Sequence, residues 1–305
     1  MKPVQITGKG FTLAAHLYLP TDFNAQQSYP AIVCVHPGGG VKEQTSGLYA
    51  ELLAEKGFIT LAFDAAYQGE SSGEPRGLED PAQRVEDISL AIDYLVNLEG
   101  VANEKIGLLG ICAGGGYAIN ATLFDKRIKA LATVSAVDIN GLFRAGFGAN
   151  PIPTLLELLN NAGAQRSQEA KDGERAYIPF VPNSPAEFNE HTPEYAKEAY
   201  DYYRTPRAQH ERASNQLLFT SVAKIFAFDA FSQVADLLTR PTLLIVGKQA
   251  DTAYFSENVF EKISHNDKQL TWIDGATHVS LYDKDVPVAL ESIATFFDTK
   301  LANAS

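Results

Sequence analysis

Residues 105–117 read KIGLLGICAGGGY and carry the clearest structural signal in this chain. An apolar strand runs into the turn GICAG at residues 110–114, and a helix of small residues follows. This pattern is typical of a nucleophile elbow, a sharp strand-to-helix turn that holds its nucleophile in a strained conformation, here with cysteine where serine is usual. Glycines flank such a turn because side chains would clash where backbones approach closely. Cys112 is therefore the predicted nucleophile, and the N–H of Ala113 is predicted to point at a developing oxyanion.

A buried cysteine in a glycine-rich dinucleotide loop is the alternative interpretation of this segment. The G-x-G-x-x-G spacing of such loops is absent here, and the segment lies deep in the chain. The strand-turn-helix context therefore favours the elbow.

Strands and helices alternate on both sides of the elbow. The Asp80-Pro81 pair suits the N-cap and the first position of a helix. Apolar runs and periodicity predict strands at 11–19, 31–36, 58–63, 105–109, 128–137, 241–247 and 269–273, with helices at 47–56, from 81, at 113–124 and at 287–301. This order predicts an α/β protein with a mostly parallel central sheet and helices on both faces.

The alternation stops at about Asp138. Residues 139–236 show helical stretches, a proline-containing connector and frequent aromatic residues, but no buried parallel strand. We therefore predict a core of residues 1–138 and 237–305 with an inserted helical cap at 139–236. Most of the cap's aromatic side chains are expected to pack within the insertion, and the cap is expected to shape an apolar pocket.

The second chemical segment is HPGGG at residues 36–40, directly after a predicted strand. It resembles the oxyanion loop of the H-G-G-G type, in which glycines let a backbone N–H approach the substrate oxygen. Either Gly38 or Gly39 is the predicted second donor. We expect His36 to have a structural role.

The base and the acid are predicted from strand ends. His278 follows the last predicted strand, where a loop can place an imidazole over the elbow. Asp251 follows the preceding strand and is predicted to hold His278 in the needed tautomer. Asp138, at the end of an earlier strand, is the alternative acid. The chain order Cys112, Asp251, His278 is the order of the α/β-hydrolase fold. We also expect the helix N-terminus and the imidazole to favour the Cys112 thiolate.

Composition narrows the remaining function classes. The chain has 305 residues and a net charge of −12, which disfavours nucleic acid and anionic membranes as partners. We find no apolar signal region and no run of eighteen apolar residues, and so expect a cytoplasmic protein. The two cysteines do not form a disulfide framework, and Cys34 lies in an apolar run that predicts a buried strand. Without ligand spacing such as H-E-x-x-H or a phosphate-cradling loop, we expect no metal and no cofactor.

Together these motifs resemble the α/β-hydrolase superfamily, and in particular its dienelactone-hydrolase-like branch, which carries Gly-x-Cys-x-Gly-Gly at the elbow. Residues 63–71, FDAAYQGES, resemble uncharacterised bacterial hydrolases and fungal polyketide thiohydrolase or transferase proteins near that branch. Tyr67 stands near an Arg position of related hydrolases, so the resemblance implies that it lines the pocket or donates to the oxyanion. Dienelactone hydrolases proper lack a cap of this size and carry a Glu in the first oxyanion loop, where this chain has only Glu43 nearby.

The sequence thus predicts a hydrolase that cleaves a carboxylic ester, lactone or thioester of a small-molecule acyl substrate. The predicted intermediate is acyl-Cys112, formed by a Cys-His-Asp triad. An acyltransferase using the same acyl-enzyme is one alternative, and a non-catalytic ligand-binding protein of this fold is another. The sequence is compatible with a homo-oligomer.

Overall fold

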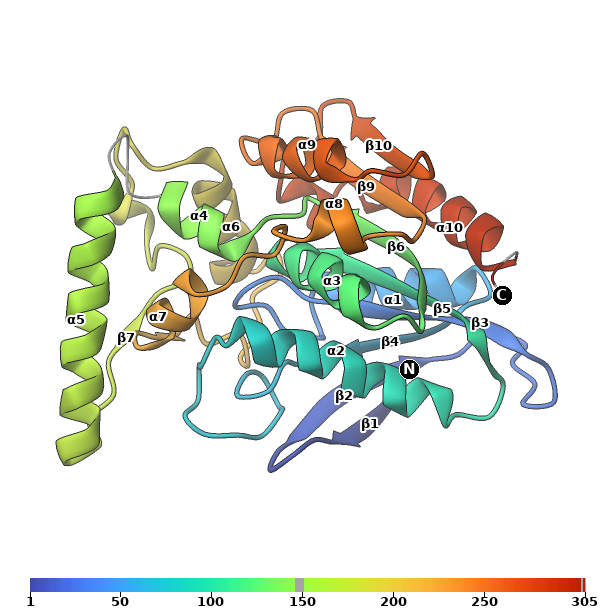
Figure 1. Ribbon diagram of the computed structural model, residues 1–305, viewed down its shortest axis with the longest axis horizontal. Coiled ribbons are helices and arrows are strands. Elements are labelled where there is room, and N and C mark those ends of the chain that lie inside the picture. The colour runs from blue at the N-terminus through green and yellow to red at the C-terminus, as the bar shows by residue number, and fades with distance from the viewer. Residues whose placement is uncertain (146–150, 303, 305) are drawn as a thin grey trace.

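The computed structural model describes residues 1–145, 151–302 and 304 (Figure 1). Its centre is an eight-stranded sheet in the order β1-β2-β4-β3-β5-β6-β9-β10. The pairs β1–β2 and β2–β4 are antiparallel, and the remaining pairs are parallel. The strands are β1 (Lys2–Thr7), β2 (Thr12–Tyr18), β3 (Tyr29–Val35), β4 (Ile59–Phe63), β5 (Val101–Ile111), β6 (Ile128–Val134), β9 (Thr242–Gly247) and β10 (Lys268–Ile273).

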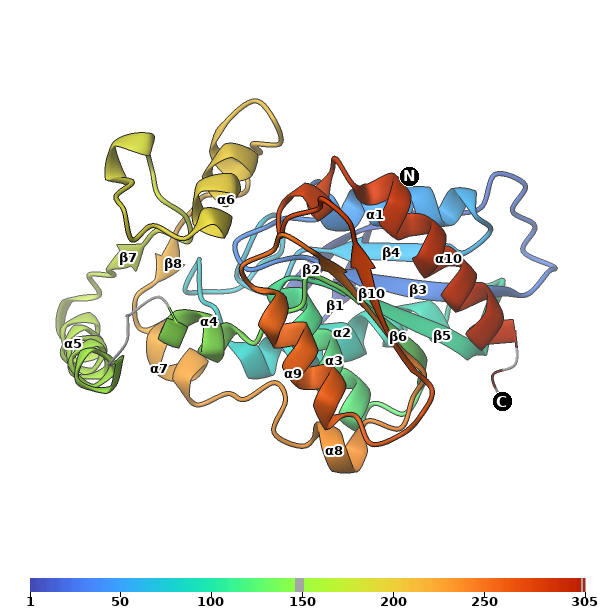
Figure 2. The same ribbon diagram turned by 90° about the horizontal axis from the view of Figure 1, so that it is seen from above.

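Helices cover both faces of the sheet (Figure 2). One face carries α2 (Pro81–Val96), α3 (Ala113–Phe124), α8 (Val234–Leu237) and α9 (Ala253–Lys262), and the other carries α1 (Thr45–Glu55) and α10 (Val286–Ala302). The predicted α/β-hydrolase fold is confirmed. The sequence analysis missed the edge strand β1, whose largely exposed side chains give no apolar run.

Local sequence explains helix α2 as predicted. Asp80 is its N-cap and accepts from the N–H of Gln83, and Pro81 occupies the first turn. Ile88, Ile92 and Leu95 lie on one face of the helix and are fully buried.

The strand order places two loops side by side. Strands β3 and β5 are neighbours in the sheet. Strand β4, which follows β3 in the chain, lies on the far side of β3, whereas β6, β9 and β10 continue the sheet beyond β5. In parallel α/β sheets, ligands bind beyond the carboxyl ends of the strands at such a switch point. The loop after β3 holds residues 36–40, and the turn after β5 holds Cys112. The two predicted chemical segments are therefore adjacent in the fold.

We call the described residues between β6 and β9 the insert. It contains α4 (Ile139–Ala145), α5 (Pro151–Asp172), β7 (Tyr177–Ile178), η1 (Pro185–Glu187), α6 (Glu194–Arg204), β8 (Leu217–Leu218), α7 (Ser221–Phe226) and α8. The elements α4 to α7 gather at one end of the molecule, and α5 stands out from the rest (Figure 1). Helix α8 returns to pack on α3 and α9. Strands β7 and β8 pair antiparallel, so the insert is not wholly helical. Of the predicted cap, residues 146–150 lie outside the described residues.

Within the described part of the chain, every helix is too short or too polar to cross a lipid bilayer.

Candidate active site

Cys112 occupies the turn between β5 and α3 in a strained backbone conformation. Its φ is 56° and its ψ is −124°, in a region that residues other than glycine rarely adopt. The carbonyl of Cys112 accepts hydrogen bonds from the N–H of Gly115 at 2.8 Å and of Val137 at 3.0 Å. These bonds fix the turn, which therefore has the geometry expected of a nucleophile elbow.

The glycines of the elbow are required by close backbone contacts. A Cβ atom on Gly114 would lie 2.5 Å from the carbonyl oxygen of Val35 and 2.6 Å from that of His36. A Cβ atom on Gly110 would lie 2.4 Å from the carbonyl oxygen of Gly114. Since backbone cannot move aside cheaply, only glycine lets α3 start this close to the end of β3.

Two backbone N–H groups face the sulfur. The N–H groups of Ala113 and Gly38 lie beside Sγ of Cys112 and lower the pKa of its thiol. Gly39 instead has a φ of +71°, and a Cβ there would lie 2.8 Å from the ring of Phe180. Of the two predicted glycines, Gly38 is thus the one whose N–H lies beside the thiol. Gly39 supplies the left-handed turn on which Phe180 rests.

Buried polar contacts hold the loop that carries Gly38. The Nδ1 atom of His36 donates to the carbonyl of Pro37 at 2.6 Å, and its Nε2 accepts from the N–H of Ala65 at 3.1 Å. Arg84 donates to the carbonyl of His36 at 2.7 Å and lies 4.8 Å over the ring of Tyr117. Desolvation and the Arg84 charge lower the pKa of His36 well below its usual value, so the ring stays neutral. His36 is a structural residue here, as the sequence analysis expected.

His278 lies in the site, with both ring nitrogens engaged. Nδ1 hydrogen-bonds to Oγ1 of Thr252, and Nε2 lies 3.0 Å from the hydroxyl of Tyr282. The same hydroxyl lies beside the Cys112 thiol in the cavity wall and lowers its pKa. A chain of contacts therefore runs from Thr252 through His278 and Tyr282 to Cys112.

The structure does not bring Asp251 against His278 as its predicted orienting acid, because Thr252 lies at Nδ1. Asp251 is exposed, and its carboxylate accepts from the N–H of Tyr195 at 3.2 Å, in the first turn of α6. The free N–H groups and the dipole of a helix N-terminus favour a carboxylate there. The alternative acid, Asp138, accepts from the N–H of Gly141 at 3.1 Å in α4. Each carboxylate thus binds the start of an insert helix.

Sequence reasoning missed Thr252 and Tyr282 as site residues. Thr252 directly follows Asp251, and Tyr282 is the fourth residue after His278, in η2 (Ser280–Tyr282). Helical spacing gives no signal for Tyr282, because His278 lies in a turn and only residues 280–282 form the short helix η2.

A mostly apolar cavity of ≈ 200 Å³ opens at Cys112. The insert provides most of its wall through α4, α6 and the segment after β7. Its lining residues are Pro37, Gly38, Cys112, Ala113, Ile139, Leu142, Phe143, Phe180, Val181, Tyr195, Ala199, Tyr203, His278, Val279 and Tyr282. The aromatic residues that the insert contributes to this wall are Phe143, Phe180, Tyr195 and Tyr203.

Tyr67 lies outside the Cys112 cavity. It has a φ of 70° and lines a neighbouring cavity of ≈ 210 Å³ together with Arg76, Arg212 and Asn215. Phe180 borders both cavities. The implied role of Tyr67 at the oxyanion is therefore not supported by its position.

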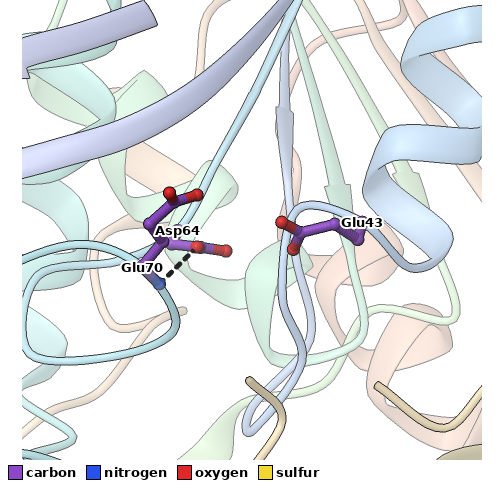
Figure 3. A group of neighbouring side chains, drawn as sticks. All are labelled: Glu43, Asp64 and Glu70. Atoms are coloured by element: carbon purple, nitrogen blue, oxygen red, sulfur yellow. Dashed lines mark hydrogen bonds between the residues drawn. The ribbon is translucent and has the colours of Figure 1, made fainter. Parts of the chain in front are cut away.

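Figure 3 shows three neighbouring carboxylates, those of Glu43, Asp64 and Glu70. Among the described residues, this is the group of acidic side chains whose ligand atoms lie close enough to hold a metal ion, all within 4.8 Å. The buried ammonium of Lys42 already contacts all three, at 2.8, 2.9 and 2.8 Å. The cluster is therefore an ion-pair network that ties the loop after β3 to the loop after β4.

The thiol and the imidazole are both neutral at rest. Burial raises the pKa of Cys112, and it outweighs the Tyr282 hydroxyl and the N–H groups of Ala113 and Gly38, which lower that pKa. Burial lowers the pKa of His278 to about 4. The expected resting thiolate is thus not supported, because desolvation outweighs the groups that favour charge.

Known proteins resemble this chain over most of its length. Residues 27–285 match the family described as serine aminopeptidase, S33. The chain is 43% identical over 294 residues to the uncharacterized protein YcjY of Escherichia coli K12, covering 95% of each chain. It is 39% identical over 296 residues to PA2218 of Pseudomonas aeruginosa, covering 96% of this chain and 78% of that one. The crystal structure of PA2218 has a TM-score of 0.90 at 37% identity and covers 98% of this chain and 93% of that one. Thiohydrolase aneE of Aspergillus aculeatus is 30% identical over 187 residues, 60% of this chain and 57% of that one.

The low pKa of His278 predicts an acid-sensitive fold. In the unfolded chain the imidazole has its usual pKa of 6.5, whereas in the folded protein it is about 4. Between these values the unfolded state binds the proton and the folded state does not, so stability falls as pH falls. From pH 7 to pH 5 this one group removes about 2 kcal/mol from the free energy of unfolding.

Urea unfolding of wild type and His278→Gln at both pH values measures the effect. Wild type is expected to lose about 2 kcal/mol more than the variant, which has no imidazole at this position. Equal losses would show that His278 titrates normally in the folded protein.

Proposed function

The chain belongs to the family described as serine aminopeptidase, S33, and from that premise we propose that it is a hydrolase that acts through an acyl-Cys112 intermediate. Its proposed substrate is a carboxylic ester, lactone or thioester of a small molecule. The family description names serine, whereas this chain has Cys112 at the turn, so the chemistry is argued from a thiol. The dienelactone-hydrolase-like branch stays a prediction.

The proposal rests on the groups that surround one atom, Sγ of Cys112. The strained turn presents Sγ of Cys112 to the cavity, and the N–H groups of Ala113 and Gly38 face it. Preorganised donors at this place stabilise the charge that develops on a carbonyl oxygen during acyl transfer. In the proposed reaction the sulfur attacks the carbonyl carbon, His278 receives the proton, and the leaving group takes it when the tetrahedral intermediate collapses. Water then releases the acid from Cys112.

The apolar wall supplied by the insert supports an acyl group with a hydrocarbon body. Side chains such as Leu142, Phe143 and Phe180 can cover it and limit the access of water to the acyl-enzyme. The name of thiohydrolase aneE supports thioesters as one substrate class. The same apolar wall favours a second candidate function, transfer of the acyl group to an alcohol or amine in place of water.

Acylation is expected on Cys112 and on no other residue. Brief exposure to activated esters and acyl thioesters should add one acyl mass to wild type, or turn the donor over, because the thiol is the nucleophile. Cys112→Ala should do neither. Cys34→Ala is the matched control and should behave as wild type, since Cys34 is fully buried in β3. Equal adducts on wild type and Cys112→Ala would refute the proposal, and addition of an alcohol separates ester formation from hydrolysis.

The orienting partner of His278 is tested by a pair of neighbouring substitutions. Thr252→Val removes the hydroxyl at Nδ1 while keeping the shape of the side chain, and should lower kcat/KM about tenfold through the lost hydrogen bond. Asp251→Asn keeps an acceptor for the first turn of α6, so kcat/KM should change less than about threefold. A larger loss in Asp251→Asn than in Thr252→Val would restore Asp251 as the acid of the triad.

A further inference from the structure

We propose that Tyr282 is a catalytic residue that carries the proton between Cys112 and His278. Its hydroxyl lies 3.0 Å from Nε2 of His278 and interacts with the thiol of Cys112 in the cavity that both residues line. One oxygen thus joins the thiol to the imidazole. The catalytic role rests on the proposed function, whereas the coupling of the three groups does not.

The fold leaves the Tyr282 hydroxyl little freedom to be elsewhere. The residue ends the short helix η2, and its N–H donates to the carbonyl of Val279 at 3.0 Å. Its ring is 2% exposed and lies edge-on to Tyr202 and His278, with centroids 5.2 and 5.6 Å apart. Because the ring is packed on several sides, its hydroxyl oxygen is already in position and loses no conformational entropy during the reaction.

The charges of the site favour a concerted transfer. Burial raises the pKa of Tyr282 well above its usual value and raises that of Cys112, while it lowers the pKa of His278. A separate tyrosinate or thiolate would be costly in this desolvated place. Protons can therefore move most easily when both bonds change together.

Two protons move in the proposed attack step. As Sγ bonds to the carbonyl carbon, its proton passes to the oxygen of Tyr282, and the Tyr282 proton passes to Nε2 of His278. The carbonyl π electrons move to the oxygen that faces Ala113 and Gly38. Tyr282 ends neutral and His278 ends as an imidazolium, with its Nδ1–H donating to Thr252. Collapse of the intermediate returns the proton along the same path to the leaving oxygen or sulfur.

The first test measures the thiol without any acyl substrate. Iodoacetamide alkylation of Cys112 is followed by intact mass across pH 6 to 10. Tyr282→Phe keeps the ring and removes only the hydroxyl. At pH 7, Tyr282→Phe and His278→Gln should each slow alkylation about tenfold. The double variant should be no slower than either single variant, because the two groups act in series. The control is Tyr202→Phe, which removes the hydroxyl of the ring packed against Tyr282 and should stay within about twofold of wild type.

Two results would overturn the relay. Tyr282→Phe could react as fast as wild type while His278→Gln stays slow, which would mean that His278 reaches the thiol directly. The losses in the two single variants could also multiply in the double variant, which would mean that they act independently. A proton inventory of wild type in mixtures of H₂O and D₂O needs no variant: curvature indicates two moving protons, and a straight line would contradict the relay.

The second test separates the relay from the proposed function. With an acyl donor, Tyr282→Phe should lower kcat about a hundredfold and change KM less than about threefold, as expected for a group that acts in the transition state. Coupled alkylation without any acyl adduct on wild type would keep the relay and reject the acyl function. Acylation of Tyr282→Phe at the wild-type rate would keep the function and reject the relay.

Discussion

The contact between the start of helix α3 and the end of strand β3 is the constraint on which the site depends. Gly114 lies so close to the carbonyl groups of Val35 and His36 that a methyl group cannot be accommodated. This contact requires β3 and β5 to be neighbours, and it brings the N–H of Gly38 and the N–H of Ala113 to the same sulfur. The strained backbone of Cys112 forms the turn after β5, and the buried His36–Arg84 contacts and the Lys42 network hold the loop after β3.

The insert is tied to the core through the acids that follow the strands. Asp138 binds the start of α4, and Asp251 binds the start of α6, the two helices that provide much of the cavity wall. A carboxylate used in this way is not free to orient His278, and Thr252 takes that position with a neutral hydroxyl. The thiol and the imidazole of this site are neutral and desolvated before the reaction. Charge therefore develops only during the reaction, and preorganised hydrogen-bond donors must stabilise it.

The sequence was sufficient for features that depend on local chemistry. Glycine spacing around Cys112 predicts the elbow, and its strand-turn-helix context predicts the fold, because few backbones need that pattern. The sequence was not sufficient where side chains from distant segments can contact the same atom. The choice between Gly38 and Gly39 depends on where Phe180 of the insert rests, and the partner of His278 depends on whether α6 takes the carboxylate of Asp251. Tyr282 enters the wall of the Cys112 cavity from the end of η2, a placement that its own sequence does not signal.

The most direct test of the central claim is a crystal structure of the acyl-enzyme, trapped with a slowly hydrolysed acyl group. The account predicts a bond from Sγ of Cys112 to the acyl carbon, with the acyl chain between α4 and α6. The carbonyl oxygen should lie about 2.7–3.1 Å from the backbone nitrogens of Ala113 and Gly38. An acyl group on another side chain, or a carbonyl oxygen turned away from these two nitrogens, would contradict the account.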